Sequence, residues 1–434
     1  MMISGKKAAF IKGTFILTMT GFINKIIGFF YRIFLSNKIG AEGMGIYQLI
    51  FPVVAICHAI TIGGLSTAIS KLGAEKHALK DEAGAKSILF SGLIISTILS
   101  ILTGTLLMIS ADTLAVHIYN EQRCGLLFKI IALSLPFSAI HSCICGYYFG
   151  KKQTMVPSIS QLVEQVIRVG SVFLICHILE SRNAPIDISV AVIGIVIGEI
   201  ISMLFCLTVF GHDSTTMPKT MDGLCFLPLI RLSLPLSFNH LALHLLQSVE
   251  AILLPLSLAS FGLESSEALQ VYGTLTGMAL PFILFPSAIT NSIATLLLPT
   301  IAEAKAANNQ KLIRSLIYKS FTLSITFGFL LTAGFLITGS FLGEFFFHST
   351  LAGHFIRTLS FLCPFLCLAI TLESILNGLG KTMTSFLHNI IGLVIRILFV
   401  LFTIPSVGIT GYLWGILASE ILISLLHLYS LRKS

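Results

Sequence analysis

Charged residues are scarce in this sequence. Asp, Glu, Lys and Arg make up 11% of the 434 residues, whereas hydrophobic residues make up 55%. A soluble domain carries roughly a quarter charged residues, so a soluble enzyme is excluded because its surface would be left apolar. The sequence also lacks cysteines or histidines at zinc-site spacing, and Ile375 stands where a phosphate-binding loop ending in Gly380-Lys381-Thr382 needs its first glycine. We therefore expect no metal site, no nucleotide and no enzymatic activity.

Long apolar segments dominate what is present. Each membrane span needs about 20 apolar residues, which predicts an all-α polytopic membrane protein with about twelve transmembrane helices. The first segment contains Lys25 and Arg32, which favours a span over a removable signal peptide. Pro235, Pro255, Pro281, Pro286 and Pro299 predict kinks or breaks in the two longest segments. The predicted spans are 13–36, 46–70, 87–110, 124–149, 155–179, 188–211, 229–260, 269–300, 316–340, 355–379, 383–405 and 409–431.

The basic residues are distributed unequally between the two sides of the predicted topology. An even number of spans puts both termini on one side, and most Lys and Arg residues fall on that side. The opposite side has only Lys38, Arg123, Lys129, Arg182 and Arg357. By the positive-inside rule we expect both termini to be cytoplasmic in a bacterial inner membrane. The net charge of +8 then needs no nucleic-acid partner.

The chain repeats itself. Gly150-Lys151 and Thr154 precede Val166-Ile-Arg168, just as Gly380-Lys381-Thr382 precedes Val394-Ile-Arg396, each arginine fourteen residues after its threonine. We predict two pseudo-symmetric six-helix lobes in the MATE-like arrangement, at 1–211 and 229–434, joined by a cytoplasmic linker at 212–228. Repeats of equal orientation predict a substrate site between them near the midplane.

Several charged side chains lie deep in predicted spans, where each costs about 3 kcal/mol to insert. Arg168 and Glu199 occupy neighbouring spans of the first repeat, and Arg396 and Glu420 repeat the arrangement, while Glu164 lies one helical turn from Arg168. A proton relay is one interpretation. We favour a structural brace inside each lobe, since a single substrate breaks the symmetry between lobes.

The first span carries a cationic face that the repeat does not duplicate. The residues of this face recur at helical spacing, and Asn24 lies beside them. Its two cations, Lys25 and Arg32, are about 10 Å apart along the helix. No carboxylate in this span neutralises them. Snorkelling to the interface is the alternative for Arg32. We expect Lys25 and Arg32 to line a central cavity and to meet an anionic ligand. The face consists of Thr14, Thr18, Gly21, Lys25, Gly28 and Arg32.

Two later spans carry further polar candidates. His240, His244, Gln247 and Glu250 form one face of the seventh span, and we predict binding roles for His240 and Gln247. Asn291 in the proline-rich eighth span is a binding candidate, or bonds only to its own helix. Glu250 and Glu373 are candidates for coupling to H⁺ or Na⁺, the only cofactor expected.

These motifs resemble the stage V sporulation protein B group in the polysaccharide transporter branch of the multidrug/oligosaccharidyl-lipid/polysaccharide (MOP) flippase superfamily, which includes the lipid II flippases. The resemblance rests on Asn24-Lys25-Ile-Ile-Gly28-Phe29, Tyr31-Arg32, and Ile39-Gly40-Ala-Glu42-Gly43-Met-Gly45-Ile-Tyr47-Gln48. It implies that Lys25 takes the place of a cavity arginine of the lipid II flippases. A second such arginine falls on Tyr31, beside Arg32. Those flippases have fourteen spans, of which twelve are accounted for here.

The resemblance implies a flippase that moves a polyprenyl-diphosphate-linked saccharide, such as a peptidoglycan precursor, to the outer leaflet by alternating access. The expected partners are this lipid-linked substrate, membrane lipids and the cell-wall synthesis machinery. One alternative is an ion-coupled multidrug exporter, which predicts an acidic cavity. A second is a non-transporting scaffold for cell-wall synthesis, which predicts that the cavity charges can be neutralised without effect.

Overall fold

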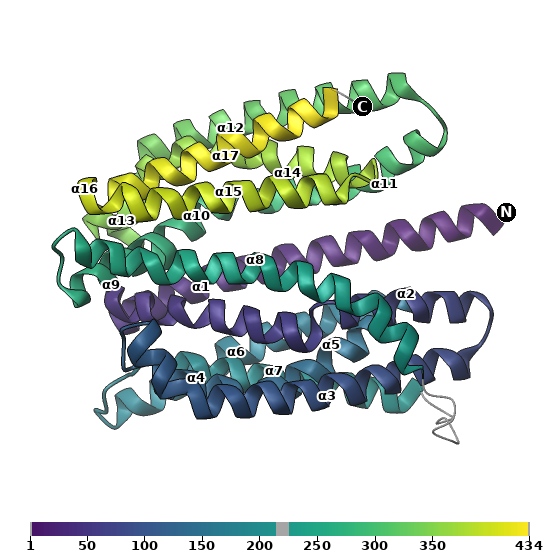
Figure 1. Cartoon of the computed structure of the whole chain (residues 1–434), viewed down its shortest axis with the longest axis horizontal. Helices are drawn as coiled ribbons and strands as arrows, with labels where there is room; N and C mark the ends of the chain where they lie inside the picture. The colour runs from purple at the N-terminus through teal and green to yellow at the C-terminus, as the bar shows by residue number, and fades with distance from the viewer. Residues whose placement is uncertain (1, 214–224, 433–434) are drawn as a thin grey trace. The chain divides into compact units, whose positions relative to one another are not determined.

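The computed structural model describes residues 2–213 and 225–432, with side chains from Ile16 onward, and all regular structure in these ranges is helical. The short elements η1, η2 and η4 are π-helical and η5 is a 3-10 helix. In chain order (Figure 1) the elements are α1 Met2–His58, η1 Ala59–Gly63, α2 Leu65–Ala78, α3 Glu82–Thr113, η2 Leu114–Ile118, α4 Cys124–Ala132, α5 Leu135–Gly150, α6 Met155–Ser181, α7 Ser189–Asp213, α8 Phe226–Ser260, α9 Ser265–Gly273, η4 Thr274–Ala279, α10 Leu280–Leu284, α11 Ser287–Ala306, α12 Gln310–Phe347, α13 Thr350–Leu359, η5 Ser360–Leu362, α14 Cys363–Gly378, α15 Thr382–Phe402, α16 Ile404–Val407 and α17 Ile409–Arg432.

The helices agree with the predicted spans. In the described ranges, nine helices are long and apolar enough to cross a membrane, and two bent pairs raise the number to eleven. The first candidate, Ile16–Ala78, has 63 residues, about three times what one crossing requires. It contains Gly40, whose backbone is not helical. Counted as two crossings, this segment brings the total to the predicted twelve.

Gly40 breaks α1 because its φ of 71° lies in the left-handed region that glycine adopts without steric cost. Beyond the break, α1 crosses the start of the α9–η4 segment at two glycines. A Cβ atom on Gly45 would lie 2.3 Å from the Leu269 carbonyl oxygen, and one on Gly273 would lie 2.1 Å from the Ala41 oxygen. The glycines at 40 and 45 therefore permit a bend and a close helix crossing.

Prolines interrupt only one of the two long segments. The segment from Ser265 to Ala306 bends by 54° between α10 and α11, where Pro286 is the N-cap of α11. In contrast, α8 is a continuous helix through Pro235 and Pro255, so it is not broken, but Figure 1 shows that it bends.

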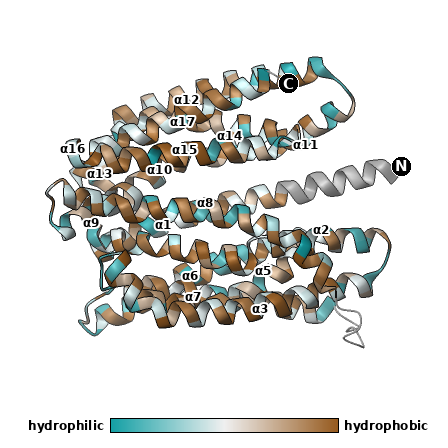
Figure 2. Cartoon of the chain, in the orientation of Figure 1, coloured by the Kyte–Doolittle hydropathy of each residue, from teal (hydrophilic) through white to brown (hydrophobic). Residues whose placement is uncertain are grey.

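The long helices consist largely of hydrophobic residues, as Figure 2 shows, and many of these side chains are exposed. On α3, exposed side chains recur one per turn at Ile98, Leu102, Leu106 and Ile109. Ile337 on α12 is 82% exposed. Apolar faces of this length fit a hydrocarbon environment.

The chain packs into two compact units that differ from sequential halves. Unit 1 consists of the described parts of Met1–Gly28 and Leu49–Ser248, and unit 2 of Phe29–Gln48 and of Val249–Ser434 as far as residue 432. The predicted halves 1–211 and 229–434 differ from these units because parts of α1 and α8 pack with the other set of helices. Most of the predicted linker 212–228 lies outside the described residues.

The internal repeat appears as the same packing in each unit. In unit 1, α5 packs against α2, α3 and α7, and α6 packs against α7; in unit 2, α14 packs against α11, α12 and α17, and α15 packs against α17. Equivalent glycines permit equivalent contacts. Gly150 lies against the Ser70 carbonyl and Gly378 against the Leu298 carbonyl, with a built Cβ 2.7 Å from each oxygen. The pseudo-symmetric six-helix organisation is confirmed.

Candidate functional site

Lys25 and Arg32 of α1 have no internal counter-charge in the described part of the chain. The Lys25 side chain is exposed and that of Arg32 is partly buried. Neither forms an ion pair or a side-chain hydrogen bond with a described residue. The Asn24 Oδ1 atom beside them is buried and also has no hydrogen-bond partner among the described residues. The Thr14 side chain lies outside the described ones.

Gly28 shows which way this face of α1 turns within unit 1. A Cβ atom at Gly28 would lie 3.4 Å from Gln165 Nε2 on α6. Lys25 lies three residues before Gly28, on the same side of the helix. The face that carries Lys25 is therefore turned toward α6.

The cation of α6, Arg168, is neutralised within its own helix. It forms an ion pair with Glu164, four residues earlier, and its Nη1 atom donates to Gln165 Oε1 at 3.5 Å. Glu199 of α7, the expected cross-helix partner of Arg168, instead lies with Oε2 3.5 Å from His141 Nδ1. The brace of unit 1 thus includes a histidine that was not predicted.

His141 is the centre of a buried polar cluster between α5, α6 and α7. Its Nε2 atom is hydrogen-bonded to Ser160 Oγ, and its Nδ1 atom lies 3.3 Å from Ser202 Oγ. The cluster contains two sets of three metal-ligand types whose ligand atoms lie within 4.8 Å of one another: His141, Cys145 and Cys206, and His141, Glu164 and Glu199. Because His141 is already bonded to side chains on two other helices, the cluster serves as a brace. The absence of a bound metal stays a prediction.

The polar face of the seventh span lies on α8. The rings of His240 and His244 stack with centroids 6.4 Å apart, and His244 Nδ1 lies 2.9 Å from Gln247 Oε1. His240 packs beside Gly63 of η1, where a built Cβ would be 3.5 Å from its own. The three side chains of unit 1 thus form a continuous face, and Glu250, one turn further, belongs to unit 2.

Unit 2 has a different brace from the one expected. Arg396 Nε lies 3.0 Å from Glu250 Oε1, although its N–H is not aligned for a hydrogen bond. The hydroxyl of Tyr412 on α17 donates to the same carboxylate oxygen at 2.9 Å. Glu420, the predicted partner of Arg396, is close enough to interact with it electrostatically but forms no ion pair within the described ranges. Glu250 is therefore the direct counter-ion.

The remaining candidates have local partners. Glu373 Oε1 accepts a hydrogen bond of 3.0 Å from Asn389 Nδ2 on α15. Asn291 donates to the Ser287 carbonyl one turn earlier, at 2.9 Å. Asn291 therefore bonds to its own helix through its amide nitrogen, and its binding role stays a prediction.

Two site residues, His141 and Tyr412, were missed by sequence reasoning. His141 follows Ser138 and precedes Cys145 at helical spacing, and this pattern of small polar residues is the only signal. Tyr412 has no distinguishing pattern. Its role depends on the rotation of α17, which hydropathy does not determine.

Residues 10–305 match the family described as polysaccharide biosynthesis protein. The chain is a member of this family. Residues 245–402 also match the MatE family.

This polysaccharide biosynthesis family member has relatives in Bacillus subtilis (strain 168). It is 29% identical to Stage V sporulation protein B over 441 residues, covering 98% of this chain and 84% of that protein. It is 22% identical to Lipid II flippase MurJ over 418 residues, covering 89% of this chain and 76% of that protein.

Solved structures confirm the fold. The inward-facing multidrug resistance MATE family transporter of the MOP superfamily superposes with a TM-score of 0.74 at 15% identity, covering 94% of each chain. Together these relationships identify a multi-pass membrane protein of the polysaccharide biosynthesis family that has the fold of the MATE transporters. The two Bacillus subtilis relatives above are named as a sporulation protein and a flippase, and neither is named as an enzyme.

Proposed function

We propose that the protein is a flippase that moves a polyprenyl-diphosphate-linked saccharide, such as a peptidoglycan precursor, from the cytoplasmic to the outer leaflet by alternating access. One observation carries the proposal. Arg168 and Arg396 are each paired with a carboxylate, whereas Lys25 and Arg32 have no such partner among the described residues.

An unneutralised cation within a span costs about 3 kcal/mol, so a bound anion is a favourable counter-charge. Seven residues separate Lys25 from Arg32, which is about 10 Å along a helix. A diphosphate carries charge enough for both cations and has acceptor oxygens that suit ammonium and guanidinium donors. Asn24 adds an amide that suits a saccharide hydroxyl.

The orientation follows from the basic residues. With both termini in the cytoplasm, the excess of Lys and Arg lies on the inner side of a bacterial cytoplasmic membrane. Movement toward the outer leaflet then makes the substrate available to the cell-wall synthesis machinery.

Coupling to H⁺ or Na⁺ is assigned to Glu373. Among the described residues its carboxylate has a single hydrogen-bond partner, the neutral Asn389, whereas Glu250 is neutralised by Arg396. The binding or release of one cation changes the charge at Glu373 without breaking an ion pair.

The experiment is complementation of bacterial cells depleted of their native lipid II flippase, combined with a direct assay of precursor translocation. Lys25→Ala should abolish rescue, and Lys25→Arg should restore it because the charge is kept. Lys319→Ala, an exposed cation on α12, is the matched control and should rescue fully. Expression and monodispersity of each variant in detergent separate loss of function from misfolding.

Full rescue by Lys25→Ala would contradict the proposed role of this cation. A drug-efflux activity that responds to Glu250→Gln, without precursor translocation, would indicate a multidrug exporter. Rescue by variants that neutralise both Lys25 and Arg32 would indicate a scaffold.

A further inference from the structure

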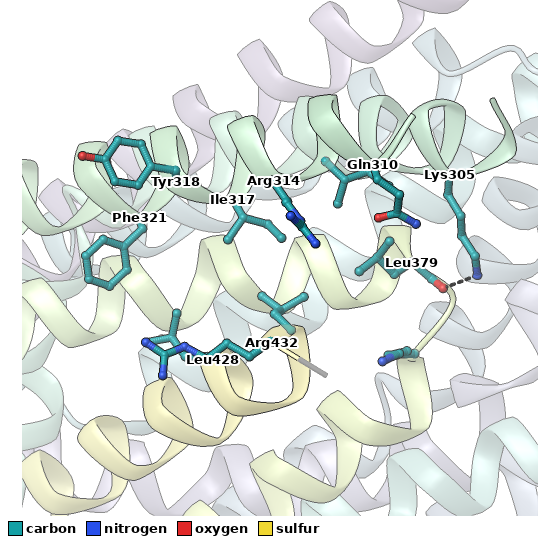
Figure 3. A pocket seen from close by; sticks show the side chains of 12 residues that line it. Lys305, Gln310, Arg314, Ile317, Tyr318, Phe321, Leu379, Leu428 and Arg432 are labelled. Carbon is teal, nitrogen blue, oxygen red and sulfur yellow. Dashed lines mark hydrogen bonds between the residues drawn. The ribbon is translucent and has the colours of Figure 1, made fainter. Parts of the chain in front are cut away.

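Unit 2 contains a cavity of about 900 Å³ that the proposed function does not use. It lies between α11, α12 and α17, beside the connection from α14 to α15 (Figure 3). Four cations and no carboxylate line it: Lys305, Arg314, Lys381 and Arg432.

The two lysines are already bonded to main-chain oxygens. Lys305 Nζ donates to the Leu379 carbonyl at 2.6 Å, and Lys381 Nζ donates to the Ser430 carbonyl at 3.4 Å. Both oxygens lie at or near the carboxyl end of a helix, where cations are favourable. The lysines therefore stabilise the walls of the cavity.

The two arginines differ from the lysines. Arg314 on α12 and Arg432 at the end of α17 are exposed, and no described residue forms an ion pair or a hydrogen bond with either. Figure 3 shows Arg314 and Ile317 projecting from α12, with Leu428 and Arg432 on α17. Both guanidinium groups line the same cavity, and guanidinium donors suit the oxygens of an anion.

The rest of the lining is apolar. Ile317, Phe321 and Leu428 line the cavity along α12 and α17, and Tyr318 is 72% exposed. Figure 3 shows the Arg432 guanidinium beside Leu428. The cations lie near the ends of α11, α12 and α17, at the depth of lipid headgroups for helices that span a bilayer. Basic pockets between helices at this depth suit anionic lipid headgroups.

We propose that this cavity binds an anionic glycerophospholipid, with its phosphate between Arg314 and Arg432 and an acyl chain along Ile317, Phe321 and Leu428. A single phosphate diester fits two available guanidinium groups. The proposal is independent of the proposed function because it uses neither Lys25 nor Arg32.

The test measures binding of fluorescent phosphatidylglycerol to the full chain purified in a mild detergent, with native mass spectrometry to count retained lipids. Each cation near a membrane surface contributes enough for about a five-fold change in affinity. Arg314→Gln and Arg432→Gln should each weaken binding about five-fold, and the double variant about 30-fold if the effects add. Phosphatidylcholine has the same phosphate but also a choline cation, so it should bind more weakly than phosphatidylglycerol and lose less affinity in these variants.

Lys311→Gln is the matched control, because Lys311 is an exposed cation on α12 outside the cavity lining, and its affinity should equal that of the wild type. Melting temperatures without lipid verify folding, and Arg314→Glu gives a second variant with a larger expected loss. Affinity unchanged in the double variant would overturn the proposal. Equal dependence on Arg314 for inorganic phosphate would overturn the lipid assignment, and tighter binding of undecaprenyl diphosphate at this site would overturn the glycerophospholipid.

Discussion

Arg396 of α15 and Glu250 of α8 form an ion pair inside unit 2, with 3.0 Å between Nε and Oε1. Tyr412 fixes the carboxylate by donating a hydrogen bond of 2.9 Å to the same oxygen. The pair joins two helices, and α17 contributes the third member. Removing either charge therefore leaves the other without its direct counter-ion.

Arg396→Gln should lower the free energy of unfolding by about 3 kcal/mol, because Glu250 loses its counter-charge. Thermal unfolding in detergent measures the effect. The double variant Glu250→Gln/Arg396→Gln should recover most of the loss, since no charge is left unpaired. Arg231→Gln, an exposed arginine on α8, serves as the control, and a double variant no more stable than Arg396→Gln would contradict the pairing.

Gly45→Ala should destabilise unit 2 by about 1–3 kcal/mol, the range typical of overpacking. The added methyl would lie 2.3 Å from the Leu269 carbonyl oxygen, and a backbone oxygen within a helix moves little. Gly73→Ala on α2 is the control because nothing lies within 4 Å of its Cβ position. It should leave stability unchanged or raise it by up to about 1 kcal/mol. Equal melting temperatures for the two variants would argue against the close crossing.

His141→Leu should lower the stability of unit 1 by about 1–3 kcal/mol, because Ser160 and Ser202 lose a hydrogen-bond partner in a buried environment. Glu199 loses its neighbour at 3.5 Å as well. Chemical unfolding in detergent gives the difference. His177→Leu, at an exposed position on α6, is expected to be neutral, and an equally small effect at His141 would show that the cluster is not a brace.

Asp81 makes the start of α3 sensitive to pH. Its carboxylate accepts hydrogen bonds from Gly84 N at 2.8 Å and Lys76 Nζ at 3.0 Å, and these hold the pKa of Asp81 below its usual value. Because the pKa of Asp81 is lower in the folded state, its ionised carboxylate stabilises the folded protein fully above the unfolded-state pKa. This stabilisation disappears as the pH falls through the folded-state pKa. Amide exchange at Gly84 should therefore be more protected than in Asp81→Asn at pH 6, and the difference should vanish below the folded-state pKa. A difference independent of pH would contradict this assignment.

The spans were predictable because hydropathy over about 20 residues determines which segments enter a membrane. The repeat was predictable too, because the spacing from Thr154 to Arg168 recurs from Thr382 to Arg396. The partners of Arg396 and Glu199 were not, because they depend on which helices are neighbours and how each is rotated. Glu250 lies far from Arg396 in the sequence, and no periodicity connects them.

The basic cavity was even less predictable from the sequence than these ion pairs. Lys305, Arg314, Lys381 and Arg432 each look like ordinary cations at helix ends, and the positive-inside rule accounts for them as a group. These four residues come from α11, α12, α17 and the connection before α15, and only the folded structure brings them together. It also shows that the two lysines bind carbonyl oxygens, whereas the two arginines have available donors.

The membership of α1 and α8 in the two units has a consequence for biosynthesis. Residues 29–48 are made early but belong to unit 2, and residues 226–248 follow the end of the first repeat but complete unit 1. When the first six spans have been synthesised, they include residues 29–48, which belong to unit 2, but lack residues 226–248, which belong to unit 1. Neither copy of the duplication therefore coincides with one compact unit, and unit 1 is complete only after residues 226–248 have been synthesised.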